Sequence, residues 1–393
     1  GHARVLVGVR LSGPASLTVQ VIKADSGTVV RTTTDASPRR AGRAYLLLDA
    51  VDGAGFQLPA GAYRLRIQAT DAQGGVSAAL QGMFTLRLTP PRGRLDAYTI
   101  PVWRAFRRSA GTTAPGHLVV AVAPRGAAAA AGIRRGDVIR AIGGIDVRSA
   151  GALAAAQRNL PARTGVRVDL VRGGSPVTVT LRPRPDWERA PDYGPALRWV
   201  TRREPRVFAY AAAQVRHLIE SGEADQATAA IARWPAGWRA SAPGQLLAGD
   251  IRADAGRWRP ALGAYSRARA RDRRMGAAEI GRGTALAELD RRRPAIAAYR
   301  AAAAIDPADP VAHGFLAYAL LRDGRAAEAA AAAGEAVRLD KRYADGFLPL
   351  GIALLGQGSR AAGVKALRRG LLLLEDSERA ARLIRTHLEP ADP

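Results

Sequence analysis

Hydrophobic and polar positions follow three different patterns along the 393 residues. Up to about residue 88 they alternate with a period of two, which is typical of half-buried strands. Leu17, Val19 and Val21, for example, share one face of such a strand. Turn clusters rich in Gly, Asp and Ser separate the apolar runs. About six short strands at this spacing predict an antiparallel β-sandwich over residues 1–90.

A second pattern occupies residues 91–186. The apolar run 118–122 predicts a buried strand, residues 149–159 predict a short Ala-rich helix, and residues 166–181 predict a hairpin that turns at Gly173. Strands and a helix mixed over so short a segment predict a small α+β domain. Residues 187–204 then read as a linker.

The third pattern, over residues 205–393, repeats every 34 residues. Small residues stand five positions after and seven positions before most of the repeat nodes, where closely crossing helices need them. The nodes are Gly222, Gly256, Asp290, Gly324 and Gly358. The spacing predicts five antiparallel helix pairs within 207–374, with a node at each turn. A final helix near 377–388 would cover the open apolar end of the array.

The run Leu58-Pro59-Ala60-Gly61-Ala62-Tyr63 resembles the Ig-like module of flagellar hook-cap proteins. Because this module is also reused in exported bacterial proteins, the resemblance implies an extracytoplasmic location, either secreted or in the cell envelope. Asp49 and Asp52 precede this run. We interpret both as turn-forming residues rather than calcium ligands, because the further oxygen ligands that calcium needs are missing from the sequence nearby.

The run Ala-Gly-Ile-Arg-Arg-Gly-Asp-Val-Ile at 131–139 resembles the PDZ domain of HtrA-like serine proteases and C-terminal processing proteases. The resemblance implies a groove that takes a C-terminal peptide as an added strand beside a helix. By the family spacing, the carboxylate-binding loop would be Tyr98, Thr99 and Ile100, followed by a groove strand with Val102. The groove face of the helix would carry Ala150, Leu153, Ala154 and Gln157. The alternative is a packing module without a ligand.

The 34-residue period resembles the tetratricopeptide repeat (TPR). The resemblance implies a concave face lined by the first helix of each pair. Six positions before the nodes stand the candidate concave residues Arg216, Asp250, Thr284 and Tyr318. The alternative is that this line is ordinary surface. The Asn-based carboxylate clamp of chaperone-binding repeats is excluded, because the only Asn of the chain is Asn159, outside the array.

Charge adds candidate partners. The chain carries a formal charge of +25, and residues 91–190 hold 17 basic against 6 acidic residues. Acidic peptides or an anionic surface are therefore candidate partners. The basic residues expected near the groove mouth are Arg104, Arg107, Arg108, Arg134 and Arg135. Nucleic acid is disfavoured because aromatic residues are not interleaved with the basic ones. No apolar stretch approaches the roughly 18 residues needed to span a membrane.

Catalytic and metal-binding motifs are missing from the sequence. There is no Cys, and the five His residues are widely separated. Nucleophile, phosphate-loop and dinucleotide signatures are likewise missing. We therefore expect no enzyme activity, no catalytic residue, no metal and no cofactor. The sequence favours a scaffold or adaptor that binds protein or peptide partners through a PDZ groove and a TPR solenoid. The alternatives are a regulatory, substrate-presenting subunit of a protease or secretion machine, and a structural component of a surface assembly.

Overall fold

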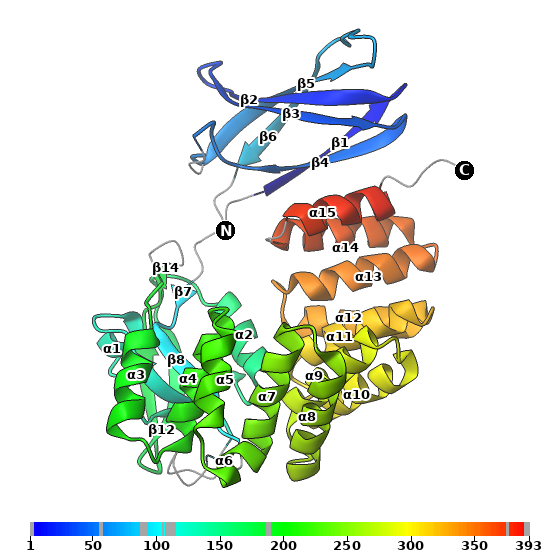
Figure 1. Cartoon of the computed structure of the whole chain (residues 1–393). Helices are drawn as coiled ribbons and strands as arrows, with labels where there is room; N and C mark the ends of the chain where they lie inside the picture. The colour runs from blue at the N-terminus through cyan, green and yellow to red at the C-terminus, as the bar shows by residue number, and fades with distance from the viewer. Residues whose placement is uncertain are drawn as a thin grey trace. The chain divides into compact units, whose positions relative to one another are not determined.

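The computed structural model describes residues 4–54, 58–86, 93–103, 106, 115–185, 190–374 and 377–388. The chain divides into two compact units (Figure 1). One consists of Gly1–Pro90 with Val364–Pro393, and the other of Pro91–Gly363. The predicted fold class, a β-sandwich followed by an α+β domain and an all-α array, is confirmed.

The N-terminal strands form the predicted sandwich. Its strands are β1 (Arg4–Leu11), β2 (Ala15–Lys23), β3 (Val29–Arg39), β4 (Gly42–Asp49), β5 (Gly61–Thr70) and β6 (Leu80–Leu86). β1 pairs with β4, and the other four follow the order β3-β2-β5-β6, all antiparallel. Leu17, Val19 and Val21 are buried as the alternation predicts, in one core with side chains of β4 and β5. Tyr63 donates its hydroxyl to the carbonyl of Pro59, 2.8 Å away, which ties the Leu-Pro-Ala-Gly turn to β5.

Of the two Asp residues before that turn, Asp52 forms a turn as predicted, whereas Asp49 ends strand β4. Asp52 accepts the amide of Ala54 at 2.9 Å, and Asp49 pairs with Arg4 at 2.7 Å. This unit also contains the end of α14 (Arg360–Leu373), α15 (Ser377–Leu383) and η2 (Ile384–Leu388). The last two fall where the final helix was predicted.

The middle region folds around one sheet of the order β13-β12-β10-β9-β8, with β11 beside β10. Its strands are β8 (Ala97–Pro101), β9 (His117–Val122), β10 (Val138–Ile142), β11 (Ile145–Asp146), β12 (Val166–Arg172) and β13 (Ser175–Leu181). Helices α1 (Ala127–Ala130) and α2 (Ala150–Arg158) accompany it, and β7 (Gly93–Arg94) pairs with β14 (Arg184–Pro185). Gly132 and Gly136 both have positive φ, which explains the glycines of the 131–139 motif.

The C-terminal array consists of helix pairs. In chain order they are α4 (Phe208–Glu220) and α5 (Ala224–Ala232), α7 (Ala242–Asp254) and α8 (Trp258–Arg271), α9 (Gly276–Glu288) and α10 (Arg292–Ile305), α11 (Pro310–Arg322) and α12 (Ala326–Leu339), and α13 (Ala344–Gly356) and α14. The short α6 (Ala236–Ala240) follows α5, which ends before Pro235. The segment expected to be a linker contains α3 (Gly194–Arg203).

Every node of the 34-residue lattice lies at a turn between two helices with a left-handed backbone. The φ values are +75° at Gly222, +67° at Gly256, +54° at Asp290, +76° at Gly324 and +79° at Gly358. A residue with a Cβ is strained in this region. The lattice therefore repeats because the same left-handed residue must end the first helix of each pair.

The small residues before the nodes have a packing reason. A Cβ at Gly249 would lie 2.5 Å from the ring of Tyr265, and one at Gly283 would lie 2.5 Å from the ring of Tyr299. Each tyrosine ring packs this closely against the preceding helix only because that helix has a glycine there. The close helix crossing that the sequence predicts is confirmed at these two pairs.

We expect Gly324→Ala to lower the free energy of unfolding by about 1 kcal/mol, because Ala must adopt the left-handed conformation. Asp290→Gly should raise it by up to ~1 kcal/mol for the same reason. Urea denaturation followed by tryptophan fluorescence measures this selectively, because all six Trp residues lie within 91–363.

Gly334→Ala is the matched control. Gly334 lies inside α12 with open space around its Cα, so Ala should raise stability by about 0.5–1 kcal/mol through helix propensity. If Gly324→Ala and Gly334→Ala shift stability in the same direction, the left-handed role of the nodes is wrong.

Candidate functional site

A buried carboxylate joins the middle domain to the helical array within the second unit. Asp340, which follows α12, is 0% exposed. It pairs with Nε of Arg158 at 2.6 Å and accepts Nδ2 of Asn159 at 2.9 Å, both at the end of α2. The Arg158 guanidinium also lies over the ring of Tyr343, 5.2 Å from its centroid. A buried charge is costly unless it is paired, so this contact requires both modules at once.

A second contact lies at the other end of α2. Asp309 accepts the amide of Val311 and so caps α11. Its carboxylate also lies against Gly151, where a Cβ would come within 1.8 Å of Oδ1. Burial is the main cause that raises the pKa of Asp309. Glycine at 151 therefore lets α2 approach the repeats closely.

Strand β8 packs against the first helix of the array. Ile100, Leu118 and Val120 share an apolar cluster with Phe208 and Val215 of α4. In the same contact, the Tyr98 hydroxyl donates to Oε2 of Glu220 at 2.9 Å. The sheet face that carries these residues is thus covered by α4 and is not open to a ligand.

Between these contacts lies a cavity of about 1240 Å³. Its middle-domain wall is formed by the end of β8 and the start of α2. Its other wall is formed by α4, α7 and α9, the first helices of successive repeats, and by the loops before α9 and α11. Some residues predicted for the PDZ-type groove and some predicted for the concave face, which the sequence treats as two sites, line this one cavity.

Half of the predicted site residues line the cavity. They are Val102, Ala150, Ala154, Arg216, Asp250 and Thr284. The other six do not line it: Tyr98, Thr99, Ile100, Leu153, Gln157 and Tyr318. Whether the first set binds a ligand stays a prediction.

The expectation of a carboxylate-binding loop at Tyr98, Thr99 and Ile100 is wrong. These residues are part of strand β8 and pair with β9, and the burial of Ile100 beneath α4 leaves it 1% exposed. Leu153 points into the core of the middle domain instead of a groove, beside Val168 and Leu170. The hydroxyl of Tyr318 donates to Asp345 at 3.4 Å.

Several cavity residues escaped the sequence argument, among them Tyr265 and Asp306. Tyr265 stands nine positions after a node, on a second helix, and reaches the concave side because Gly249 leaves room for its ring. Asp306 belongs to the turn before α11 and lines the cavity from the edge of the array. In the sequence, the Asp-Pro-Ala-Asp-Pro run at 306–310 could have indicated this turn.

Asp250 is the most perturbed acid of the cavity. Its carboxylate accepts the hydroxyl of Tyr265 at 2.9 Å. Burial raises its pKa to about 6, against the opposing effects of this hydrogen bond and of the nearby Arg216. Strongly shifted carboxylates in cavities are enriched at functional sites.

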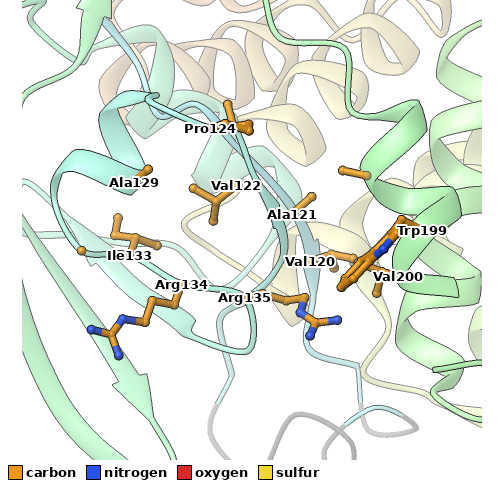
Figure 2. Close-up of a pocket in the computed structure, with 13 residues that line it drawn as sticks. Val120, Ala121, Val122, Pro124, Ala129, Ile133, Arg134, Arg135, Trp199 and Val200 are labelled. Atoms are coloured by element: carbon orange, nitrogen blue, oxygen red, sulfur yellow. The ribbon is translucent and has the colours of Figure 1, made fainter. Parts of the chain in front are cut away.

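A second, smaller pocket of about 730 Å³ lies between β9, the loop before β10 and α3 (Figure 2). Trp199, 55% exposed, forms one side, and Ile133 and Ala129 the other. Arg135 pairs with Glu204 at 2.6 Å and lies 5.7 Å from the Trp199 ring centroid.

Arg134 and Arg135 line this second pocket and do not line the cavity beside α2, where the sequence placed them. The motif loop that contains them turns toward α3, so the expected groove mouth is wrong for both. Arg104, Arg107 and Arg108 lie outside the described residues.

Three of the described histidines have packing contacts. His117 is buried and contacts the Ser149 carbonyl at 2.9 Å, and burial lowers its pKa to about 4. His217 packs against the ring of Tyr98, and His313 contacts the Pro307 carbonyl at 3.1 Å.

Over the described ranges, no group of three His, Asp or Glu side chains is arranged to hold a metal ion. In the same part of the chain, no helix combines the length and apolarity of a membrane span.

Two family models match segments of the chain. The FlgD Ig-like domain matches residues 1–73 and the PDZ domain matches residues 118–181. Both resemblances inferred from the sequence are thereby confirmed for these segments. The search of curated proteins found no significant match.

Solved structures similar to this chain include helical-repeat proteins. MamA is 21% identical with a TM-score of 0.36, and covers 42% of this chain and 95% of its own. YrrB is described as a TPR protein with an unusual peptide-binding site. It is 17% identical with a TM-score of 0.37, and the match covers 48% of this chain and 96% of YrrB. PilF of Pseudomonas aeruginosa is 15% identical with a TM-score of 0.41, covering 48% and 87%. At these TM-scores the similarities carry no functional argument.

We expect Asp340→Ala to lower the free energy of unfolding of the 91–363 unit by about 2–4 kcal/mol, because it leaves the partly buried Arg158 guanidinium without its charge partner. Tryptophan fluorescence in urea measures the loss. The matched control is Glu335→Ala, which breaks an exposed pair with Arg338 and should cost less than about 1 kcal/mol. Equal losses in the two variants would contradict a structural role for the Asp340 contact.

Asp250→Asn should raise stability at pH 7.5 by about 1–3 kcal/mol. With a pKa raised from 3.8 to about 6, the folded state holds the Asp250 proton more tightly than the unfolded state, so stability falls as the pH rises between these two values and stays low above pH 6. At pH 4 the stability gained by the substitution should be less than about a third of the gain at pH 7.5, because the Asp250 carboxyl of the folded wild type is protonated there. Urea titrations at both pH values measure it, with the exposed Asp254→Asn on the same helix as control. A destabilised Asp250→Asn protein at pH 7.5 would contradict the burial argument.

Proposed function

We propose that this chain is a non-enzymatic scaffold that binds an extended segment of a protein partner in the cavity between α2 and the concave face of the repeats. PDZ and TPR-type folds are generally non-catalytic and bind peptides or proteins, which supports an interaction role. The observation that carries the proposal is that the end of β8, α2 and the first helices of the repeats all contribute to one cavity.

The shape of the cavity favours a polypeptide. At about 1240 Å³ it exceeds the roughly 300–1,000 Å³ of typical small-molecule sites. β8 is the last strand in its sheet order, and an outer strand is where an extended chain adds. Pro101 has no amide hydrogen, so pairing would weaken at the cavity end of β8. A bound segment would there leave the strand edge and enter the concave face.

The small side chains of α2 make room for this segment. Ala150 and Ala154 line the cavity from α2, and Gly276 and Ala277 face it from the start of α9. We place the protein outside the cytoplasm, secreted or in the cell envelope, on the strength of its Ig-like module. A substrate-presenting subunit would use the same cavity transiently, and a surface assembly component would use it for a permanent partner.

We expect Ala154→Trp and Ala277→Trp each to abolish peptide binding, because an indole placed on either wall fills the cavity. Peptides of twelve random residues displayed on phage are selected on the wild-type chain, and their affinities are measured by fluorescence anisotropy. Ala331→Trp on the exposed side of α12 is the matched control and should bind like wild type.

Circular dichroism and urea denaturation show whether the variants remain folded. Selected peptides that bind both cavity variants as tightly as wild type would refute the cavity as the site. A selection that yields no binding peptide would refute the proposed function.

A further inference from the structure

We infer that the segment bound in the cavity is cationic, with Lys or Arg side chains directed at carboxylates on the repeat side. The inference rests on the proposed function and names the chemical class of its ligand. It runs against the charge of the whole chain, which is +25. The cavity lining has the opposite balance, with five carboxylates and three guanidinium groups. They are Glu220, Asp250, Asp272, Asp306 and Asp309, with Arg148, Arg216 and Arg274.

Two of the three arginines of the lining are already paired. Arg148 pairs with Asp146 at 2.7 Å, and Arg216 pairs with Glu220 at 2.8 Å. Arg216 also attracts Asp250, so one guanidinium serves two carboxylates. Among the described residues Arg274 is the one lining arginine without an ion pair, and the four lining carboxylates other than Glu220 outnumber it, which disfavours an anionic ligand.

The other carboxylates accept hydrogen bonds from neutral groups. Asp250 accepts the hydroxyl of Tyr265 at 2.9 Å, and Asp272 accepts the amide of Arg274 at 3.1 Å. Asp306 accepts the amide of Ala308 at 3.2 Å. Neutral donors orient a carboxylate without cancelling its charge. A Lys or Arg side chain of the ligand would supply the missing opposite charge and a charge-assisted hydrogen bond.

Asp306 adds an independent observation. Its Oδ2 is buried and has no hydrogen-bond partner among the described residues. A buried acceptor without a partner costs about 1–3 kcal/mol. Asp306 lines the cavity, so a small rearrangement on binding would expose this oxygen to an ammonium or guanidinium group of the ligand.

The distance from the ligand determines whether the cavity carboxylates or the surface arginines have the larger effect on binding. Exposed charges are screened beyond about 8 Å at physiological salt, whereas groups within a cavity are screened much less. The surface arginines therefore contribute little inside the cavity, where the carboxylates are nearest to the ligand. The surface charge predicts a preference for acidic peptides, and the cavity predicts the reverse.

Three peptides test the inference. Each has twelve residues in which Ser alternates with Lys, Gln or Glu, and each has an amidated C-terminus so that no terminal carboxylate contributes. Affinities for the full chain are measured by fluorescence anisotropy at pH 7.5 and 0.15 M salt. We expect the Lys peptide to bind wild type at least tenfold more tightly than the Gln peptide, and the Glu peptide to bind more weakly than both.

The double variant Asp250→Asn with Asp306→Asn should lose at least tenfold in affinity for the Lys peptide. The matched control, Glu328→Gln with Glu335→Gln, removes the same two charges from the exposed pairs of α12 and should stay within twofold of wild type. Equal losses in the two double variants would show a surface charge effect and overturn the inference.

The outcomes separate this inference from the proposed function. If library-selected peptides bind in the cavity but the Lys peptide has no advantage over the Gln and Glu peptides, the charge inference is wrong and the proposed function stands. If neither the library nor the Lys peptide yields binding that Ala154→Trp abolishes, both are wrong.

Discussion

The cavity depends on one buried carboxylate. Asp340 of the repeats is fully enclosed, and its charge is balanced by Arg158 and Asn159 at the end of α2. Removing either module would leave an unpaired charge, so the two are energetically coupled. The close approach of Gly151 to Asp309 holds the start of the same helix. With α2 fixed at both ends and β8 covered by α4, the space between them has a defined shape.

This arrangement changes what each module can do. An isolated PDZ domain offers a groove along its whole edge strand, and an isolated helical array offers its whole concave face. Here α4 covers one face of β8, and the concave face is reached together with α2. Asp250 shows the cost of the shared site, because a buried carboxylate with a pKa of about 6 lowers stability at neutral pH. Such a cost is typical of positions retained for binding.

The fold was largely predictable because its signals are local. Alternation along β2, the glycines of the 131–139 motif and the left-handed nodes each act within a few residues. The site was only half predictable because it depends on contacts between distant segments. The Arg158–Asp340 pair spans 182 residues, and no periodicity connects its two members. The family spacing places Ile100 in a loop, and nothing local to β8 reveals that α4 covers it.

A disulfide across the junction tests the coupling of the two modules most directly. The chain has no Cys, so Gly151→Cys with Asp309→Cys introduces the only thiols. The Cγ of Asp309 lies 2.4 Å from the position of a Cβ at 151, so the two side chains are in direct contact and a small outward shift brings two sulfur atoms to bonding distance. Mild oxidation of the folded full chain should link the pair nearly completely within minutes, and oxidation in urea should not. A native protein that stays reduced while Cys at 151 and 309 remain accessible to thiol reagents would contradict the account.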